Sequence, residues 1–116
     1  MSARITEARW IWKDGHLVPW HEATVHLLST AVQFGSSVFE GIRCYETPSG
    51  PAVFRLREHL ERLMDSATIY RMRPEWTVDD LVEGSRELIR ANELGSCYLR
   101  PMVLRGYGAA GLHAVD

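Results

Sequence analysis

The chain has 116 residues, which is enough for one domain with its own hydrophobic core. Its formal net charge is -2 and 24% of its residues are charged, so it has neither a basic field for nucleic acid nor an acidic tail. No apolar stretch approaches the length of a membrane span, the start lacks a signal-peptide core, and two cysteines are too few for a disulfide framework. These features predict a cytoplasmic protein without a nucleic-acid or membrane partner.

The basic side chains are unevenly divided between the two residue types. Twelve of the thirteen are arginine, and Lys13 is the only lysine. Arginine stays charged, whereas lysine can lose its proton and serve as an amine nucleophile. Any lysine chemistry within this chain would therefore have to use Lys13.

The first part of the chain predicts a hairpin and a short helical turn. Two apolar segments, 10–12 and 17–20, flank an Asp-Gly pair, which is a strong hairpin signal. Alternating apolar residues over 23–28 predict a short strand or extended segment. Ser29 can cap a helical turn that Gly35 ends.

A strand pair and two helices are predicted next. A strand over Val38–Tyr45 is followed by a turn rich in proline and glycine and by a partner strand over 52–55. From Leu56 apolar residues recur at helical spacing up to Pro74, in a stripe of Leu56, Leu60, Leu63, Met64, Ala67 and Tyr70. Thr77 is a good cap for a second helix, with Gly95 as the expected C-terminal glycine.

The last predicted strand runs over Cys97–Arg105, where Pro101 indicates an edge position or a bulge. A glycine-rich loop follows from Gly106. The elements together predict an α+β domain, with an antiparallel sheet and two helices packed on one side.

One face of the Val38–Tyr45 strand has the composition of a pocket wall. Because strand side chains alternate, Phe39, Gly41, Arg43 and Tyr45 share one face, whereas Glu40, Ile42 and Cys44 share the other. A glycine inside a strand packs nothing, which suits a place where a ligand or another backbone comes close. The alternative is a bulge glycine beside an exposed arginine.

Three further side chains are candidates for binding anions. Tyr98 and Arg100 share one strand face and could bind a carboxylate together, although an exposed arginine at a sheet edge is the alternative. Arg62 on the first helix could grip a phosphate. Its alternative is a solvated pair with Glu58, four residues earlier.

Two other chemistries are disfavoured. The Gly106–Gly111 segment matches a dinucleotide-binding fingerprint, but the residues after it are too few for the required helix and acidic residue. The five histidines lack the paired spacing of zinc enzymes, so no metal site is expected.

Several motifs in order resemble the branched-chain amino acid aminotransferases, fold-type IV enzymes that use pyridoxal phosphate. They are Phe39-Glu40-Gly41-Ile42-Arg43, the 54–63 run, Asp65-Ser66-Ala67, Ile69-Tyr70 and Tyr98-Leu99-Arg100-Pro101. The resemblance extends from about Trp10 to the last glycines. D-amino acid aminotransferases and aminodeoxychorismate lyases share this layout and remain alternatives.

The resemblance implies that residues 1–116 are the small N-terminal domain of such an enzyme, which acts on amino acids and 2-oxo acids as a homodimer or higher oligomer. By this resemblance Arg62 binds the cofactor phosphate, Phe39 lines the substrate pocket and Gly41 lets substrate approach. Tyr98 binds the substrate carboxylate and Arg100 the distal carboxylate of glutamate. Arg43 matches the motif without a clear role.

The resemblance also has departures and a gap. Phe34 stands where many members carry a tyrosine, and Leu112-His113 replaces the more usual Val-Asn. The lysine that forms a Schiff base with the cofactor is expected in a C-terminal domain that this chain does not contain, and Lys13 beside a turn would stay protonated. The chain alone is therefore expected to be inactive, and a non-catalytic binding or assembly module is the alternative from another class.

Overall fold

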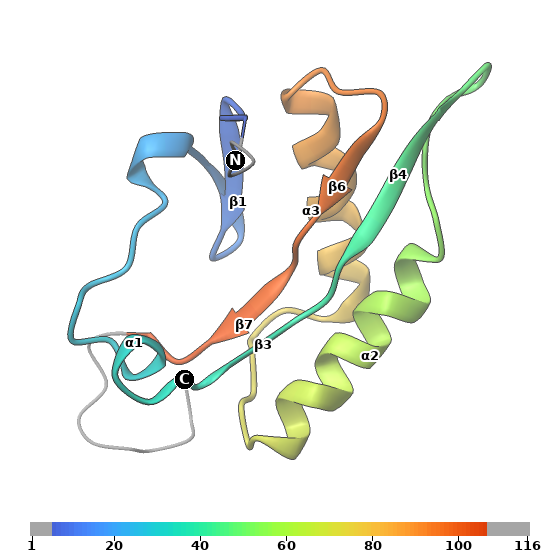
Figure 1. Ribbon diagram of the computed structural model, residues 1–116. Coiled ribbons are helices and arrows are strands. Elements are labelled where there is room, and N and C mark those ends of the chain that lie inside the picture. The colour runs from blue at the N-terminus through green and yellow to red at the C-terminus, as the bar shows by residue number, and fades with distance from the viewer. Residues whose placement is uncertain (1–5, 107–116) are drawn as a thin grey trace, which may run out of the picture.

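The computed structural model describes residues 6–106 and begins with a β-hairpin. Strands β1 (Trp10–Lys13) and β2 (His16–Pro19) pair antiparallel, with Lys13 opposite His16. The turn residues Asp14 and Gly15 both have positive φ, 52° and 92°, as the two-residue Asp-Gly turn requires. The predicted hairpin, visible in Figure 1, is confirmed.

The segment after the hairpin differs from the sequence-based expectation. A 3₁₀ turn, η1 (Trp20–Glu22), follows β2, and residues 23–28 pair with no strand in the described part of the chain. Of the two alternatives expected for this segment, the strand is therefore wrong, because alternation alone provides no partner for its backbone. Helix α1 (Thr30–Phe34) ends at Gly35, whose φ of 67° confirms the predicted stop.

The two long strands predicted in the centre of the domain are each interrupted. Strands β3 (Ser37–Phe39) and β4 (Ile42–Thr47) replace the first, and β6 (Cys97–Leu99) and β7 (Met102–Leu104) replace the second. β3 pairs with β7, whereas β4 lies between β5 (Gly50–Val53) and β6; all pairs are antiparallel. The breaks lie opposite each other, joined by the bond from the Glu40 N–H to the Pro101 carbonyl at 3.1 Å.

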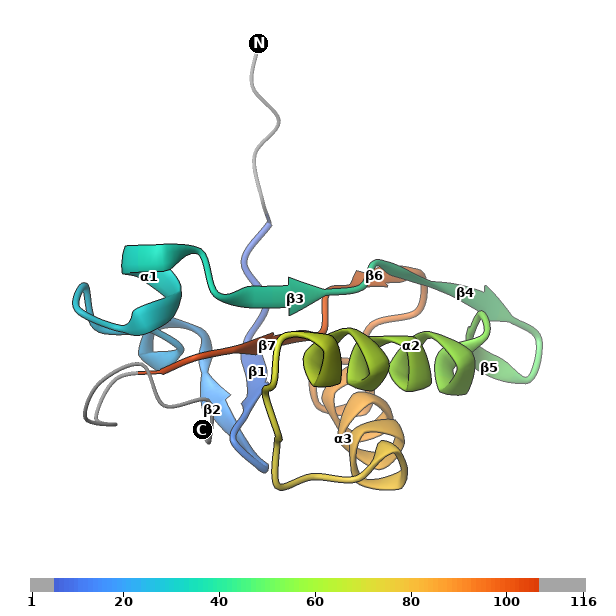
Figure 2. The same ribbon diagram turned by 90° about the horizontal axis from the view of Figure 1, so that it is seen from below.

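Two helices cover one side of these strands, as Figure 2 shows. α2 (Leu56–Ile69) and α3 (Val78–Ala91) bury apolar stripes against the sheet and against each other. The buried core consists of Val38, Ile42, Cys44, Leu56, Leu60, Leu63, Ala67, Met72, Val82, Ile89 and Leu99. This arrangement confirms the α+β fold with two helices on one side.

Of the other helix ends, the start of α3 agrees with the prediction and several differ from it. Ser29 precedes α1, but its side chain makes no capping hydrogen bond. Thr77 and Asp80 form the reciprocal capping box at the start of α3. However, Glu93, with φ of 54°, rather than Gly95, takes the left-handed conformation after α3. Arg71 takes the left-handed conformation after α2, and this helix therefore ends before Pro74. As a result Tyr70 is exposed and does not belong to the buried stripe.

The hairpin packs on α3 through a glycine and an asparagine. A Cβ at Gly84 would lie 2.7 Å from the Trp12 indole, so only glycine lets that ring come so close. Asn92 accepts hydrogen bonds from the Arg9 and Trp10 amides and donates to the Trp10 carbonyl. In residues 6–106 no helix is both long and apolar enough to cross a bilayer.

Candidate functional site

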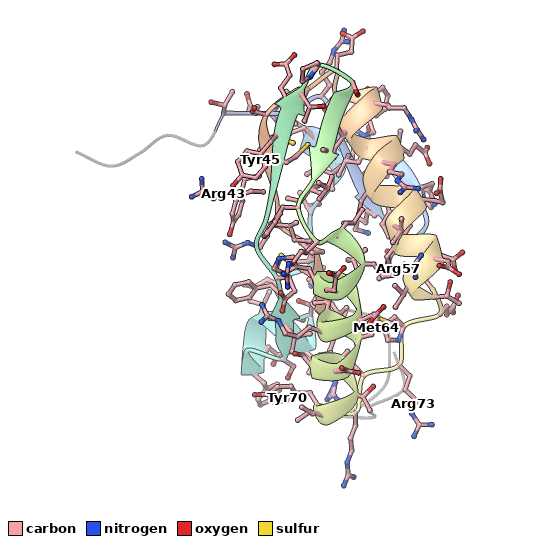
Figure 3. The ribbon with its side chains drawn as sticks, turned by 90° about the vertical axis from the view of Figure 1, so that its right-hand side faces the viewer. Arg43, Tyr45, Arg57, Met64, Tyr70 and Arg73 are labelled. Atoms are coloured by element: carbon pink, nitrogen blue, oxygen red, sulfur yellow. The ribbon has the colours of Figure 1, made fainter. Side chains whose placement is uncertain are left out.

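The strand face away from the helices carries the predicted pocket wall. The predicted alternation survives the break, because Phe39, Arg43 and Tyr45 are exposed while Glu40, Ile42 and Cys44 are buried. Figure 3 shows Arg43 and Tyr45 projecting from β4 on the side opposite α2 and α3. This open sheet face is the first half of the candidate site.

Arg100 joins the two interrupted strands on this face. Its guanidinium carbon lies 4.4 Å from the centre of the Phe39 ring and 5.5 Å from that of Tyr98. Its Nη2 also donates to the Tyr98 hydroxyl at 3.2 Å. Stacking on an aromatic ring holds the cation in place while its N–H edge stays available to an anion.

The close approach at Gly41 is made by Tyr98. A Cβ at Gly41 would lie 1.9 Å from Tyr98 Oη and 2.8 Å from Cζ, so the phenol occupies the space that a side chain would fill. The sequence predicted the approach of a ligand or another backbone at Gly41, whereas in the structure the side chain of Tyr98 makes this approach. Because Arg43 stands opposite Tyr98 in the β4–β6 ladder, all five predicted substrate-site residues lie together on this face.

Arg62 lies on the helix side of the same break. Its Nε donates to both carboxylate oxygens of Glu40, at 3.1 and 2.9 Å, and its Nη2 donates to Oε1 at 2.7 Å. His59 Nδ1 contacts the same Oε1 at 2.9 Å. The expected alternative partner, Glu58, is not the residue that Arg62 binds.

The electrostatics of this cluster favour an ionised carboxylate. The hydrogen bond from Arg62 lowers the pKa of Glu40 below its usual value of 4.5, against burial, which raises it. His59 acts in the same direction as Arg62. The pKa of the Arg62 guanidinium is raised in turn by Glu40. Both members of the pair are charged at neutral pH.

A comparison with known protein families identifies the family of this chain. The family model described as "Amino-transferase class IV" matches residues 37–116, which include both strand breaks and both long helices. The chain belongs to this family.

Its relatives point to one branch of the class IV aminotransferases. The chain is 49% identical over 107 residues to the branched-chain-amino-acid aminotransferase of Salmonella typhimurium, covering 92% of this chain and 35% of that protein. The Pseudomonas aeruginosa enzyme of the same name is 47% identical over 104 residues, covering 90% of this chain and 34% of that protein. The chain thus spans about a third of the length of the curated relatives it matches.

Solved structures show the same similarity in three dimensions. The crystal structure of the Escherichia coli branched-chain amino acid aminotransferase superposes with a TM-score of 0.87 at 47% identity, covering 93% of this chain and 36% of that one. The T.th. enzyme of the same name, complexed with N-(5'-phosphopyridoxyl)-L-glutamate, gives 0.87 at 45% identity, with 92% and 36% covered. The predicted resemblance and fold class are confirmed.

The partners of Arg62, Glu40 and His59, are residues that the sequence patterns did not predict. The alternation placed Glu40 on the strand face that also carries Ile42 and Cys44, and a carboxylate on a buried face needs a cation. That signal could have identified an ion pair with a helix arginine.

The glycine loop lies outside the described residues beyond Gly106, and Lys13 pairs with Asp14 at the hairpin turn, 3.2 Å away.

Proposed function

We propose that this chain is the N-terminal domain of a pyridoxal-phosphate-dependent aminotransferase that moves the amino group of leucine, isoleucine or valine to 2-oxoglutarate. The proposal rests above all on the open sheet face, where an aromatic ring, a phenol and an arginine meet beside Gly41. It is supported by the names of the relatives and by the phosphopyridoxyl-glutamate bound to one solved neighbour.

Arg62 suits the phosphate of the cofactor. Glu40 takes its Nε–H and one Nη2–H, which leaves Nη1 and the second Nη2–H, and the side chain is 69% exposed. A guanidinium edge of this kind matches a phosphate in shape and charge. When bound, pyridoxal phosphate supplies the electron sink that weakens the bonds at the substrate α-carbon.

The sheet face suits two different substrates in turn. The Phe39 ring offers apolar contact to the side chain of leucine, isoleucine or valine. The N–H edge of Arg100 offers two donors to the distal carboxylate of glutamate. Tyr98 would bind the α-carboxylate of the branched-chain amino acid or of glutamate. Because Gly41 has no side chain, it leaves room for the Tyr98 hydroxyl on this face.

The rest of the site belongs to further sequence and a partner subunit in this proposal. The lysine that carries the cofactor would come from a C-terminal domain, because Lys13 stands at the hairpin turn. Exposed Phe39, Tyr98 and Met102 suit burial in a domain or homodimer interface. The two unoxidised thiols, Cys44 and Cys97, which stand opposite each other, suit the cytoplasm.

The test is an assay of the complete reading frame product with pyridoxal phosphate, leucine and 2-oxoglutarate. We expect cofactor-dependent formation of glutamate and no turnover by residues 1–116 alone. Turnover of D-alanine or of aminodeoxychorismate in place of leucine would overturn the substrate assignment. A chimera in which residues 1–116 replace the matching part of the Escherichia coli enzyme should also be active, whereas a folded but inactive chimera would contradict the proposed role.

A further inference from the structure

Glu40 is a buried carboxylate at the place where the two halves of the candidate site meet. It follows Phe39 and precedes Gly41 at the break between β3 and β4, and its side chain turns to α2. Its backbone is fixed by the bond to the Pro101 carbonyl. The residue is only 6% exposed, so its charge requires partners, which Arg62 and His59 provide.

The contact with Arg62 is directional. Nε and Nη2 both donate to Glu40, which fixes the plane of the guanidinium as well as its distance. The backbone bond to Pro101 and the contact with His59 hold this carboxylate in place when the arginine moves. The opposite edge of the guanidinium, with Nη1, is therefore held in one orientation in solvent.

We propose that Glu40 is a positioning residue for the cofactor phosphate: it presents the free edge of Arg62 in the orientation that a phosphate needs. The inference rests on the proposed function, since it takes the phosphate to be that of pyridoxal phosphate. An arginine already held in place loses less conformational freedom on binding an anion than a mobile one. Glu40 thus contributes to affinity without touching the cofactor.

The neighbouring pairs on the same helix support a special role for this contact. Glu58 lies one helical turn before Arg62 and is exposed, yet Arg62 binds the buried Glu40. By contrast, Arg57 on α2 forms an exposed pair with Asp79 of α3 at 2.6 Å. That pair provides a matched control, because it is an Arg–carboxylate contact of the same helix outside the site.

The experiment compares the affinity of the complete enzyme for pyridoxal phosphate with its affinity for pyridoxal, which lacks the phosphate. The ratio of the two dissociation constants isolates the phosphate contribution from any general loosening of the site. We expect Glu40→Gln to lower this preference about tenfold, the value of one charged hydrogen bond, and to leave pyridoxal affinity within about twofold. Asp79→Asn should leave the preference unchanged.

A double variant separates action through Arg62 from other effects. Arg62→Ala should lower the phosphate preference, and adding Glu40→Gln should lower it no further. A second, equal loss in the Arg62→Ala background would overturn the inference, as would an unchanged preference in Glu40→Gln. If Glu40→Gln does not fold, Glu40→Asp carries the same comparison, because it keeps the charge but withdraws the carboxylate by one methylene.

The failures of the two proposals are distinguishable. If the unaltered enzyme binds pyridoxal as tightly as pyridoxal phosphate, the proposed function itself is wrong. If it prefers the phosphate and Glu40→Gln does not change that preference, only the role of Glu40 is wrong.

Discussion

Substituting Gly41 by alanine tests the packing at the centre of the sheet face. The new Cβ would lie 1.9 Å from Tyr98 Oη, whereas ordinary contact begins near 3.4 Å, so the phenol must withdraw by about 1.5 Å. The Tyr98 side chain is 57% exposed and has room to turn toward solvent. Its hydroxyl would then leave the position beside Arg100 where we propose that it binds the substrate carboxylate.

The expected effect is on catalysis rather than on folding. A lost hydrogen bond to a charged group is worth about 1.5–3 kcal/mol, which lowers kcat/KM for leucine by about 10- to 150-fold. The free energy of unfolding should change by no more than about 1 kcal/mol, because alanine also restricts the unfolded chain relative to glycine. Steady-state kinetics and urea unfolding of the complete enzyme measure the two effects.

The same substitution in a Tyr98→Phe enzyme tests whether the clash is with the Tyr98 hydroxyl. In Tyr98→Phe the colliding oxygen is absent, so Gly41→Ala should cost less there than in the unaltered enzyme. Full activity of Gly41→Ala would contradict a clash with Tyr98, as would an equal loss of kcat/KM when Gly41→Ala is made in the Tyr98→Phe enzyme.

Other predictions concern stability and reactivity. Gly84→Ala should destabilise the protein by about 1 kcal/mol in urea unfolding, because the clash with Trp12 outweighs the gain in helix propensity; a higher midpoint would contradict the packing. Since the folded pKa of Glu40 is lowered, the pair with Arg62 stabilises the protein above pH 4.5 and is lost as pH falls through that folded pKa. The free energy of unfolding should therefore fall less steeply with decreasing pH in Glu40→Gln than in the unaltered protein. Identical slopes in the two proteins would count against the ion pair. Burial is the main cause that raises the pKa of the Cys97 thiol to about 11. Its alkylation at mildly alkaline pH should therefore be at least about 100-fold slower than that of free cysteine. Equal rates would contradict the burial of this thiol.

Sequence patterns predicted the sheet face and offered a bulge at Gly41 and at Pro101 as alternatives, but they did not predict that both strands break there. Removing two residues from a ladder preserves the alternation, so Phe39 and Arg43 stay on one face whether or not Glu40 and Gly41 are paired. The break depends on Pro101, which has no N–H to donate, and on which residue lies opposite it. Only the folded chain sets that pairing.

The partner of Arg62 shows the same limit in electrostatic terms. Helical spacing offers Glu58, and an exposed pair of that kind is worth little. A buried carboxylate at Glu40 gains far more from the cation, but 22 residues separate the two in sequence. Local spacing could not predict a contact that the packing of α2 on β3 creates.

We propose that Arg62 binds the cofactor phosphate and that Arg100 binds the distal carboxylate of glutamate. A crystal structure of the complete protein with N-(5'-phosphopyridoxyl)-L-glutamate tests both contacts at once. We expect hydrogen-bond distances of about 3 Å from Arg62 Nη1 or Nη2 to the phosphate and from Arg100 to the side-chain carboxylate. A phosphate bound away from Arg62, with the glutamate side chain directed away from Phe39 and Arg100, would contradict it.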